Sequence, residues 1–242
     1  MSHWIIPDWP APACVRACST TRHGGVSAEP WHSLNLGVHV GDIESHVREN
    51  RQRLVVEALL PSMPQWLNQV HGTDVVRLPS EVILPDADAA ITRESGVVCA
   101  VMTADCLPVL FCSKDGKEVA AAHAGWRGLC NGVLEKTLAQ FHCSPADILV
   151  WLGPAIGPQA FEVGEEVRDA FMTFDPAAQQ AFRAVGDNYF ADLWLLARQR
   201  LSAAGVNAIS GVTRCTYTES DDFFSWRRDG VTGRMATLIW LR

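Results

Sequence analysis

VVCAVMTADCLPVLFCSKDGKEVAAAHAGWRG, residues 97–128, contains three apolar runs separated by short turns. The runs are residues 97–103, 108–112 and 118–123, and each is rich in β-branched or small apolar side chains. Runs of about four to eight such residues are typical of buried strands. The segment therefore predicts three neighbouring strands in the core of the protein.

Strands and helices are both expected on either side of this segment. Apolar residues at helical spacing predict a helix between Asp42 and Pro61, with Asp42 or Ser45 as its N-cap. Further strands are expected at residues 66–70, 74–78 and 148–152. Further helices are expected at 129–141, 163–174 and 190–204, a turn at 125–128, and a strand-rich tail from 211 to 242 with a turn at 228–230. Many strands follow one another without a helix, which favours mixed or paired sheets with outer helices. We expect an α+β fold in a single domain, residues 1–242.

Composition and charge are those of an ordinary soluble protein. Of the 242 residues 48% are hydrophobic and 19% charged, and the formal net charge is −7. This charge argues against a nucleic-acid binder, which needs a basic surface, although local arginines can still bind an anionic substrate. The first residues show no signal peptide, and the most apolar stretch, 97–112, is shorter than the roughly 20 residues of a membrane helix. We expect a cytoplasmic protein with no membrane partner, and in that compartment the eight cysteines are expected to be free thiols. No C-x-x-C motif occurs, which argues against zinc knuckles and thioredoxin-like redox motifs.

Three segments place a metal-capable side chain where a predicted strand meets a turn. These side chains are His71 in NQVHGTD, Cys106 in TADCLP and His123 in AAHAGWRG. Imidazole and thiolate suit Zn²⁺, and three protein ligands leave a fourth coordination position for water or substrate. The spacings of 35 and 17 residues match no general zinc pattern. A lone His or Cys at a strand end is more often a structural residue than a metal ligand, so residue types alone do not decide between these two roles.

The same segments carry a resemblance that covers essentially the full length. NQVHGTDV, TADCLPVLF and AAHAGWRGL resemble the signature segments of the YfiH-type family, also called laccase-domain or polyphenol oxidase proteins. TTRHGGVS, SLNLG, ENRQRL, GPAIGP and FFSWRRDGVTGRMA extend the likeness, with Trp226 where Tyr is expected. The resemblance implies that His71, Cys106 and His123 bind the metal. It also implies a CNF-toxin/YfiH-like fold, layered α/β/β/α with mixed sheets.

The laccase label of this family can be tested against the sequence. A multicopper oxidase needs about ten histidines in H-x-H and H-C-H arrangements to hold its copper centres. This chain has eight histidines and no H-x-H pair, and Ser144 follows His142-Cys143, so no H-C-H exists either. We therefore do not expect a multicopper laccase, although copper can occupy a His/Cys/His site as an adventitious metal.

The resemblance instead implies zinc-dependent purine nucleoside chemistry. The reactions are phosphorolysis of adenosine, inosine and methylthioadenosine, with adenosine deamination as a companion. Cys106 and Asp105 are the candidate catalytic residues, Asp105 as a proton-transfer group or, equally, as a carboxylate that braces its turn. Guanidinium groups suit phosphate, and Trp226 or Phe224 could stack on a purine. The candidate substrate- and phosphate-binding residues are Arg22, Asn35, Arg48, Arg51 and Arg127, each with a structural role as the alternative.

Other functions stay open at this stage. Some relatives are described as peptidoglycan-editing factors that remove L-serine from UDP-MurNAc-L-Ser, a reaction that a zinc-activated water would also serve. Without a metal, Cys106 would be a nucleophile and His123 its base, as in cysteine hydrolases. A non-enzymatic binding module is the third alternative. If the chain is an enzyme, its partner is a small-molecule substrate. The sequence does not decide between a monomer and a homodimer.

Overall fold

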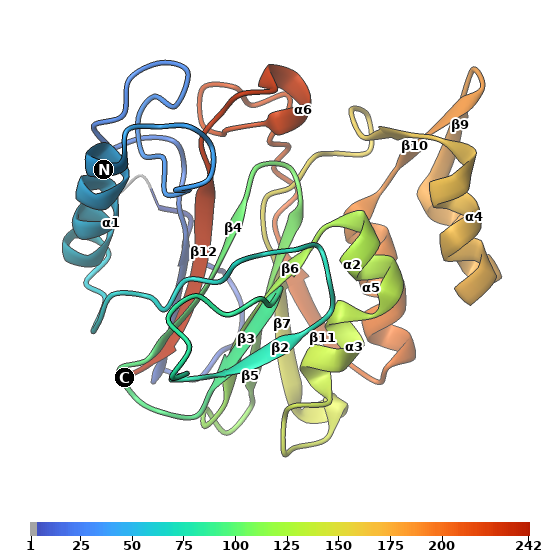
Figure 1. Cartoon of the computed structure of the whole chain (residues 1–242). Coiled ribbons are helices and arrows are strands. Elements are labelled where there is room, and N and C mark those ends of the chain that lie inside the picture. The colour runs from blue at the N-terminus through green and yellow to red at the C-terminus, as the bar shows by residue number, and fades with distance from the viewer. Residues whose placement is uncertain (1–3) are drawn as a thin grey trace.

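Two sheets packed face to face form the centre of the molecule (Figure 1). The structure is a computed structural model, and it describes residues 4–242. One sheet is antiparallel with the strand order β1-β12-β4, and the other is mixed with the order β11-β7-β5-β6-β3-β2. The third sheet is small and has the order β8-β10-β9.

The elements follow the chain in this order. The strands are β1 Val15–Ser19, β2 Val75–Leu78, β3 Ala89–Thr92, β4 Val98–Thr103, β5 Leu107–Ser113, β6 Val119–Ala124, β7 Ile148–Leu152, β8 Glu162–Val163, β9 Phe182–Val185, β10 Asn188–Ala191, β11 Ala208–Gly211 and β12 Met235–Leu241. The helices are α1 Glu44–Glu57, α2 Trp126–Asn131, α3 Val133–Leu138, α4 Glu165–Phe174, α5 Leu193–Ala203 and α6 Trp226–Asp229, with 3-10 turns at Pro145–Asp147 and Pro176–Ala181.

Strand alternation in the mixed sheet explains why its central strands read as unbroken apolar runs. In β5, Val109 and Phe111 pack toward the helices, whereas Leu110 and Cys112 pack toward the antiparallel sheet. Successive side chains of a strand point to opposite faces, and here both faces are covered. All residues of β4, β5 and β6 are therefore buried.

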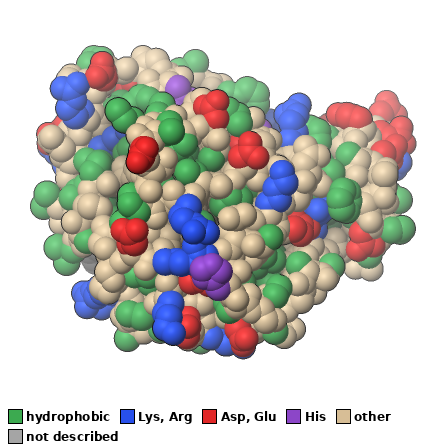
Figure 2. Space-filling model, turned by 60° about the horizontal axis from the view of Figure 1, so that its bottom comes forward, with side chains coloured by type: hydrophobic (Ala, Val, Ile, Leu, Met, Phe, Trp, Pro, Cys, Tyr) green, Lys and Arg blue, Asp and Glu red, His purple; other side chains and the backbone are tan. Residues whose placement is uncertain are grey.

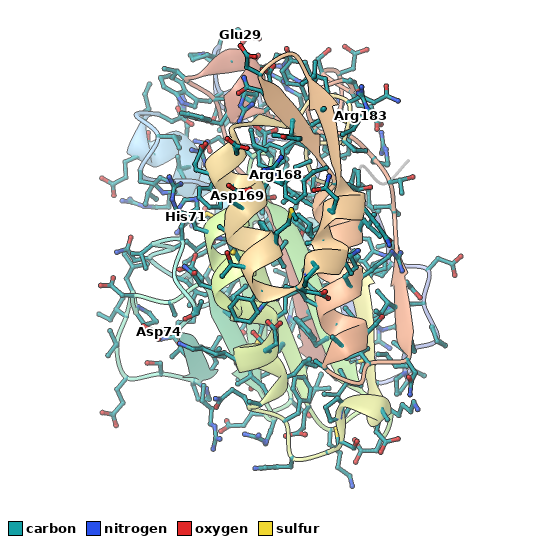
Figure 3. The ribbon with its side chains drawn as sticks, turned by 90° about the vertical axis from the view of Figure 1, so that its right-hand side faces the viewer. Glu29, His71, Asp74, Arg168, Asp169 and Arg183 are labelled. Carbon is teal, nitrogen blue, oxygen red and sulfur yellow. The ribbon has the colours of Figure 1, made fainter. Side chains whose placement is uncertain are left out.

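Helices cover the two outer faces. Helix α1 lies on the antiparallel sheet, where Leu54 joins a core with Ala100 of β4 and Leu238 of β12. Helices α2, α3 and α5 lie on the mixed sheet, and Figure 3 views the molecule from this helical side. The order of layers is thus helix, sheet, sheet, helix. The predicted α+β fold with mixed sheets in an α/β/β/α arrangement is confirmed.

Several local predictions were wrong for identifiable reasons. Residues 66–70 form no strand and make only an isolated bridge from Asn68 to Asp86. The predicted turn at 125–128 is the start of α2, and the predicted helix at 129–141 is divided because Gly132 has a φ of 96°. Glycine adopts this left-handed conformation at little cost, and it ends one helix and begins the next.

Tertiary contacts override the local signals in three further places. The helix predicted from residue 190 begins later, at Leu193, because residues 188–191 form β10 and pair with β9 as a hairpin. The predicted strand-rich tail, residues 211–242, contains the last residue of β11 and the strand β12. At the expected 228–230 turn it forms the short helix α6, which Ser225 caps. Helix α1 begins after Ile43 without a side-chain cap, because Asp42 instead accepts hydrogen bonds from Ser27 and Asn35.

Charged side chains of both signs are interspersed on the lower face of the molecule (Figure 2). Such mixing is typical of a solvated surface rather than of a phosphate-tracking face. Within residues 4–242, no helix is long and apolar enough to cross a membrane.

Candidate metal centre

The strand register brings two of the three predicted ligands together. Strands β5 and β6 are antiparallel, with Leu107 opposite Ala124 and Pro108 opposite His123. Cys106 precedes β5 and His123 lies near the end of β6, so both reach the same edge of the mixed sheet. His71 approaches from the loop before β2 (it is labelled in Figure 3). The three ligand atoms all lie within 4.8 Å of one another, and they form the cluster that can hold a metal ion in the described part of the chain.

Asp88 joins the His71 loop to β6. Its carboxylate accepts backbone hydrogen bonds from Val70, His71 and Gly72 at 3.1, 3.0 and 2.7 Å. It also contacts Nδ1 of His123 at 2.7 Å, which leaves the Nε2 edge of that ring for the cluster. A carboxylate behind a ligating histidine fixes the tautomer and orientation of the ring. Asp88 is fully buried, and its contacts hold both histidine segments in place.

The charges of Cys106 and His123 stabilise each other. Burial would raise the pKa of the Cys106 thiol, but the positive charge of His123 and hydrogen bonds with His123 and His71 lower it to about 6. Burial would lower the pKa of His123, but the Cys106 charge and the hydrogen bond to Asp88 raise it to about 9. The pair is therefore a thiolate and an imidazolium near neutral pH. A metal ion can replace the imidazolium proton, because ligands must be deprotonated to bind.

The backbone near the three candidate ligands has two residues with unusual φ angles and one glycine at a close approach. His71 and Asp105 have φ values of 59° and 101°, in the left-handed region that side chains rarely adopt. Gly125 has no such φ, but a Cβ there would lie 2.9 Å from Cδ2 of His71 and 3.1 Å from Sγ of Cys106. Strained residues and a close backbone approach are typical of functional sites.

A largely apolar pocket opens on the cluster. It has a volume of about 340 Å³, and its wall includes His71 and Cys106 from the cluster. The other lining residues are Ala104, Asp105, Trp126, Arg127, Ile156, Phe161, Leu193, Trp226 and Arg227. Apolar and aromatic walls with a few polar groups are typical of small-molecule sites of this size.

Comparison with known proteins identifies the family. A family profile described as "Multi-copper polyphenol oxidoreductase laccase" matches residues 16–242. The chain belongs to this family. It is 61% identical, over the whole of both chains, to an Escherichia coli protein named "Purine nucleoside phosphorylase YfiH". It is 54% identical to Pseudomonas aeruginosa "Purine nucleoside phosphorylase PA4543", again over the whole of both chains.

Solved structures of family members share this fold. The Neisseria meningitidis protein NMB0706 superposes with a TM-score of 0.94 at 51% identity, covering 99% of both chains. YlmD from Geobacillus stearothermophilus gives a TM-score of 0.92 at 36% identity, covering 100% of this chain and 97% of the other. The resemblance expected from the sequence is therefore confirmed.

Asp105 and Arg127 lie at the pocket of this family member. Asp105 accepts hydrogen bonds from Oγ1 of Thr216 and the backbone N–H of Arg227, both at 2.7 Å. These contacts support the turn-bracing role of Asp105 over proton transfer. The guanidinium of Arg127 lies 4.4 Å from the centre of the Trp126 ring, on the pocket wall.

The other predicted residues lie outside the wall of this pocket. Arg48 is exposed and pairs with Glu44 on the surface of α1. Arg22 donates to backbone carbonyls and covers Phe224, which is fully buried and so unavailable for stacking on a ligand. Asn35 is also buried.

Asn35 and Arg51 hold the loop that follows residue 35. The Asn35 side chain accepts backbone hydrogen bonds from Gly37 and Arg234. Arg51 donates to the carbonyl of Leu36.

Sequence reasoning missed three residues of the site. Asp88 directly precedes the apolar run AAIT, a position from which a carboxylate reaches a sheet edge. Arg227, on the pocket wall, and Arg234, beside the 104–106 turn, lie in FFSWRRDGVTGRMA, a segment that carries the family resemblance. The short-range pattern around each residue carries no sign of the long-range contacts that place it here.

Proposed function

We propose that the chain is a zinc-dependent purine nucleoside phosphorylase. The observation that carries the proposal is a nitrogen–sulfur–nitrogen cluster that opens into an aromatic pocket of about 340 Å³. A mixed imidazole and thiolate set with one open side suits a catalytic zinc site. Relatives that cover the whole chain bear the phosphorylase name. When bound, the zinc would supply a Lewis acid at its fourth position.

The pocket residues account for recognition of a nucleoside. Trp226 is 57% exposed and lines the pocket, so its indole is accessible for stacking on a purine. Phe161 adds a second ring, over which the Arg227 guanidinium lies at 5.4 Å while it donates to the carbonyl of Glu162. Rings of this kind bind flat bases, because every base has a π-face.

At C1′ of the ribose, the proposed reaction forms one bond and breaks one bond. An oxygen of hydrogenphosphate bonds to C1′ of the ribose as the C1′–N9 bond breaks, and the bonding pair leaves on the purine. The purine takes up the proton that hydrogenphosphate carried, so the products are ribose 1-phosphate and the free base. The residues of this chain would orient the base in the aromatic pocket and exclude water, which favours phosphate over hydrolysis.

The test is a side-by-side assay of the zinc-loaded protein. Adenosine, inosine and methylthioadenosine are each incubated with and without phosphate, and free base, ribose 1-phosphate and ammonia are measured. We expect release of base that requires phosphate, with ammonia from adenosine if the companion deamination occurs. Cys106→Ala, purified in the same way, controls for contaminating phosphorylases and should be inactive. Equal activity in both preparations, or no phosphate-dependent release, would contradict the proposal.

A metal-free Cys/His hydrolase is the second candidate. The lowered pKa of Cys106 and the order Cys106, His123, Asp88 match the nucleophile, base and orienting group of a cysteine hydrolase. UDP-MurNAc-L-Ser is therefore added as a further substrate, with and without a chelator. Release of serine that persists after complete metal removal, and that iodoacetamide stops, would favour the hydrolase. Release that needs zinc would favour the peptidoglycan-editing reaction.

A further inference from the structure

A second group of cations lies beside the metal cluster, across the end of β4 from the aromatic pocket. Strand β12 pairs with β4 so that Met235 is opposite Thr103, which places Arg234 at the level of Ala104. Arg234 is therefore a neighbour of the 104–106 turn that carries Cys106. The charges of Cys106 and Asp105 raise the pKa of Arg234, against the stronger lowering by burial.

Arg51 reaches the same place from helix α1. Its Nε and Nη2 donate to the carbonyl of Leu36 at 3.0 and 2.8 Å, and its guanidinium lies 4.2 Å from the centre of the Trp66 ring. Nη2 is also 4.0 Å from Sδ of Met102, in β4. These contacts fix the guanidinium next to the loop at residues 36–37.

Arg234 packs against the other part of this loop. Its Cγ lies 2.8 Å from the position that a Cβ would take on Gly37, so only glycine leaves room for the arginine stem. Its Nη1 donates to the carbonyls of Thr232 and Gly233 at 3.2 and 3.0 Å. Among the described residues, its Nε and Nη2 have no hydrogen-bond partner.

His39, at the exposed end of the loop, adds an imidazole N–H donor to the two cationic arginines. Burial and the positive charges of Arg234 and Arg51 together lower the pKa of its imidazole. Within residues 4–242 none of the three side chains forms an ion pair with a carboxylate. Asp42, the carboxylate of the same loop, already accepts hydrogen bonds from Ser27 and Asn35. Among the described residues, neither half-buried arginine has a carboxylate within ion-pair distance, and the charges of Asp105 and Cys106 act on Arg234 from farther away.

We propose that His39, Arg51 and Arg234 form an oxyanion subsite that binds the phosphate co-substrate. This inference rests on the proposed phosphorolysis and adds the place from which phosphate enters. A hollow of about 570 Å³ opens His39 and Arg51 to solvent, with Trp66 and Met102 also in its wall. The nucleoside base would lie in the aromatic pocket, with the metal cluster between base and phosphate.

The chemistry of the three groups suits a phosphate, whose several oxygens can accept hydrogen bonds from more than one of these groups at once. Guanidinium forks donate parallel hydrogen bonds to two oxygens of a tetrahedral anion, and the half-buried position strengthens each bond. Within the described part of the chain, Nη1 of Arg51 and the Nε–Nη2 edge of Arg234 have no hydrogen-bond partner, so these donors can bind an anion. In a protein with a net charge of −7, such a local cluster is what attracts an anion.

The kinetic test compares Arg234→Gln and His39→Gln with Arg77→Gln as the matched control. Arg77 is exposed on β2, and the described residues give it no hydrogen bond. We expect the KM for phosphate to rise at least tenfold in the first two variants. The KM for inosine should stay within twofold, and Arg77→Gln should behave as wild type. An unchanged KM for phosphate in both subsite variants would overturn the proposal.

A binding measurement separates failure of the subsite from failure of the proposed function. Titration calorimetry at constant ionic strength measures the binding of inorganic phosphate and of UDP to the protein, with chloride as the competing anion. Weaker phosphate binding in the subsite variants supports the subsite even in a protein that performs no phosphorolysis. Equal phosphate binding in wild type and variants overturns it. Weaker UDP binding with unchanged phosphate binding also overturns it, and assigns the cations to a phosphate ester instead. Arg51→Gln is measured with its Tm, since it also removes the contact with Trp66.

Discussion

Asp88 links the two histidine segments of the candidate metal centre. Its two oxygens receive three backbone N–H groups of the His71 loop and the ring of His123. Burial would raise the pKa of the Asp88 carboxyl, but the hydrogen bond and charge of His123 and the backbone donors lower it. The carboxylate therefore stays ionised and can support a ligand histidine at neutral pH.

Replacing this carboxylate by its amide tests the positioning role. Asp88→Asn keeps the size but loses the charge and one acceptor, so zinc affinity should fall by about 10- to 100-fold. Competition with a chromophoric chelator measures the dissociation constant. Asp86→Asn is the matched control, because Asp86 is exposed two residues away and contacts Asn68. An unchanged zinc affinity in Asp88→Asn would show that Asp88 is only structural.

At the scale of elements, the buried strands could be predicted and the loops that carry the ligands could not. Residues 98–103 of the antiparallel sheet and 107–113 of the mixed sheet are buried on both faces, because each sheet has a layer on either side, and this signal is local. The metal cluster depends on register and on Asp88, whose partners are 16 to 18 residues away in the His71 loop and 35 away at His123. No local pattern encodes such contacts, and the ligands themselves were found through resemblance. The position of Arg234 beside Cys106 likewise follows from β12–β4 pairing.

The junction of β6 and α2 supplies a prediction at this scale. Gly125→Ala would place a Cβ 2.9 Å from His71 and 3.1 Å from Cys106, and the ligands would have to move apart. Because the φ of Gly125 is −62°, the backbone itself tolerates alanine, and the fold should persist. We expect zinc affinity to fall at least about tenfold, as for other changes that displace a ligand's support. Gly72→Ala is the control, since its Cβ would meet its neighbours at an ordinary 3.5 Å. Equal losses in the two variants would contradict the steric argument.

At the scale of the whole molecule, a bound metal would join parts of both sheets. Cys106 follows β4 of the antiparallel sheet, and His123 belongs to β6 of the mixed sheet. His71 adds the loop before β2. The ligands come together only in the folded chain, so binding free energy becomes free energy of unfolding.

Zinc should therefore raise the Tm in a way that depends on pH. At a free zinc concentration of 100 times the dissociation constant, the gain is about 2.7 kcal/mol, or roughly 5–10 °C for a domain of this size. Below pH about 9 zinc must displace the proton of His123, whose pKa is raised, and below pH about 6 also that of Cys106, whose pKa is lowered. Each displaced proton weakens binding by about 1.4 kcal/mol per pH unit, so the gain is largest at high pH and shrinks as the pH falls. Calorimetric melting at fixed free zinc between pH 8 and 5 measures it, with Cys143→Ala expected to retain the gain and Cys106→Ala to lose it. The same gain in Cys106→Ala, or a gain that does not change with pH, would mean that zinc binds elsewhere.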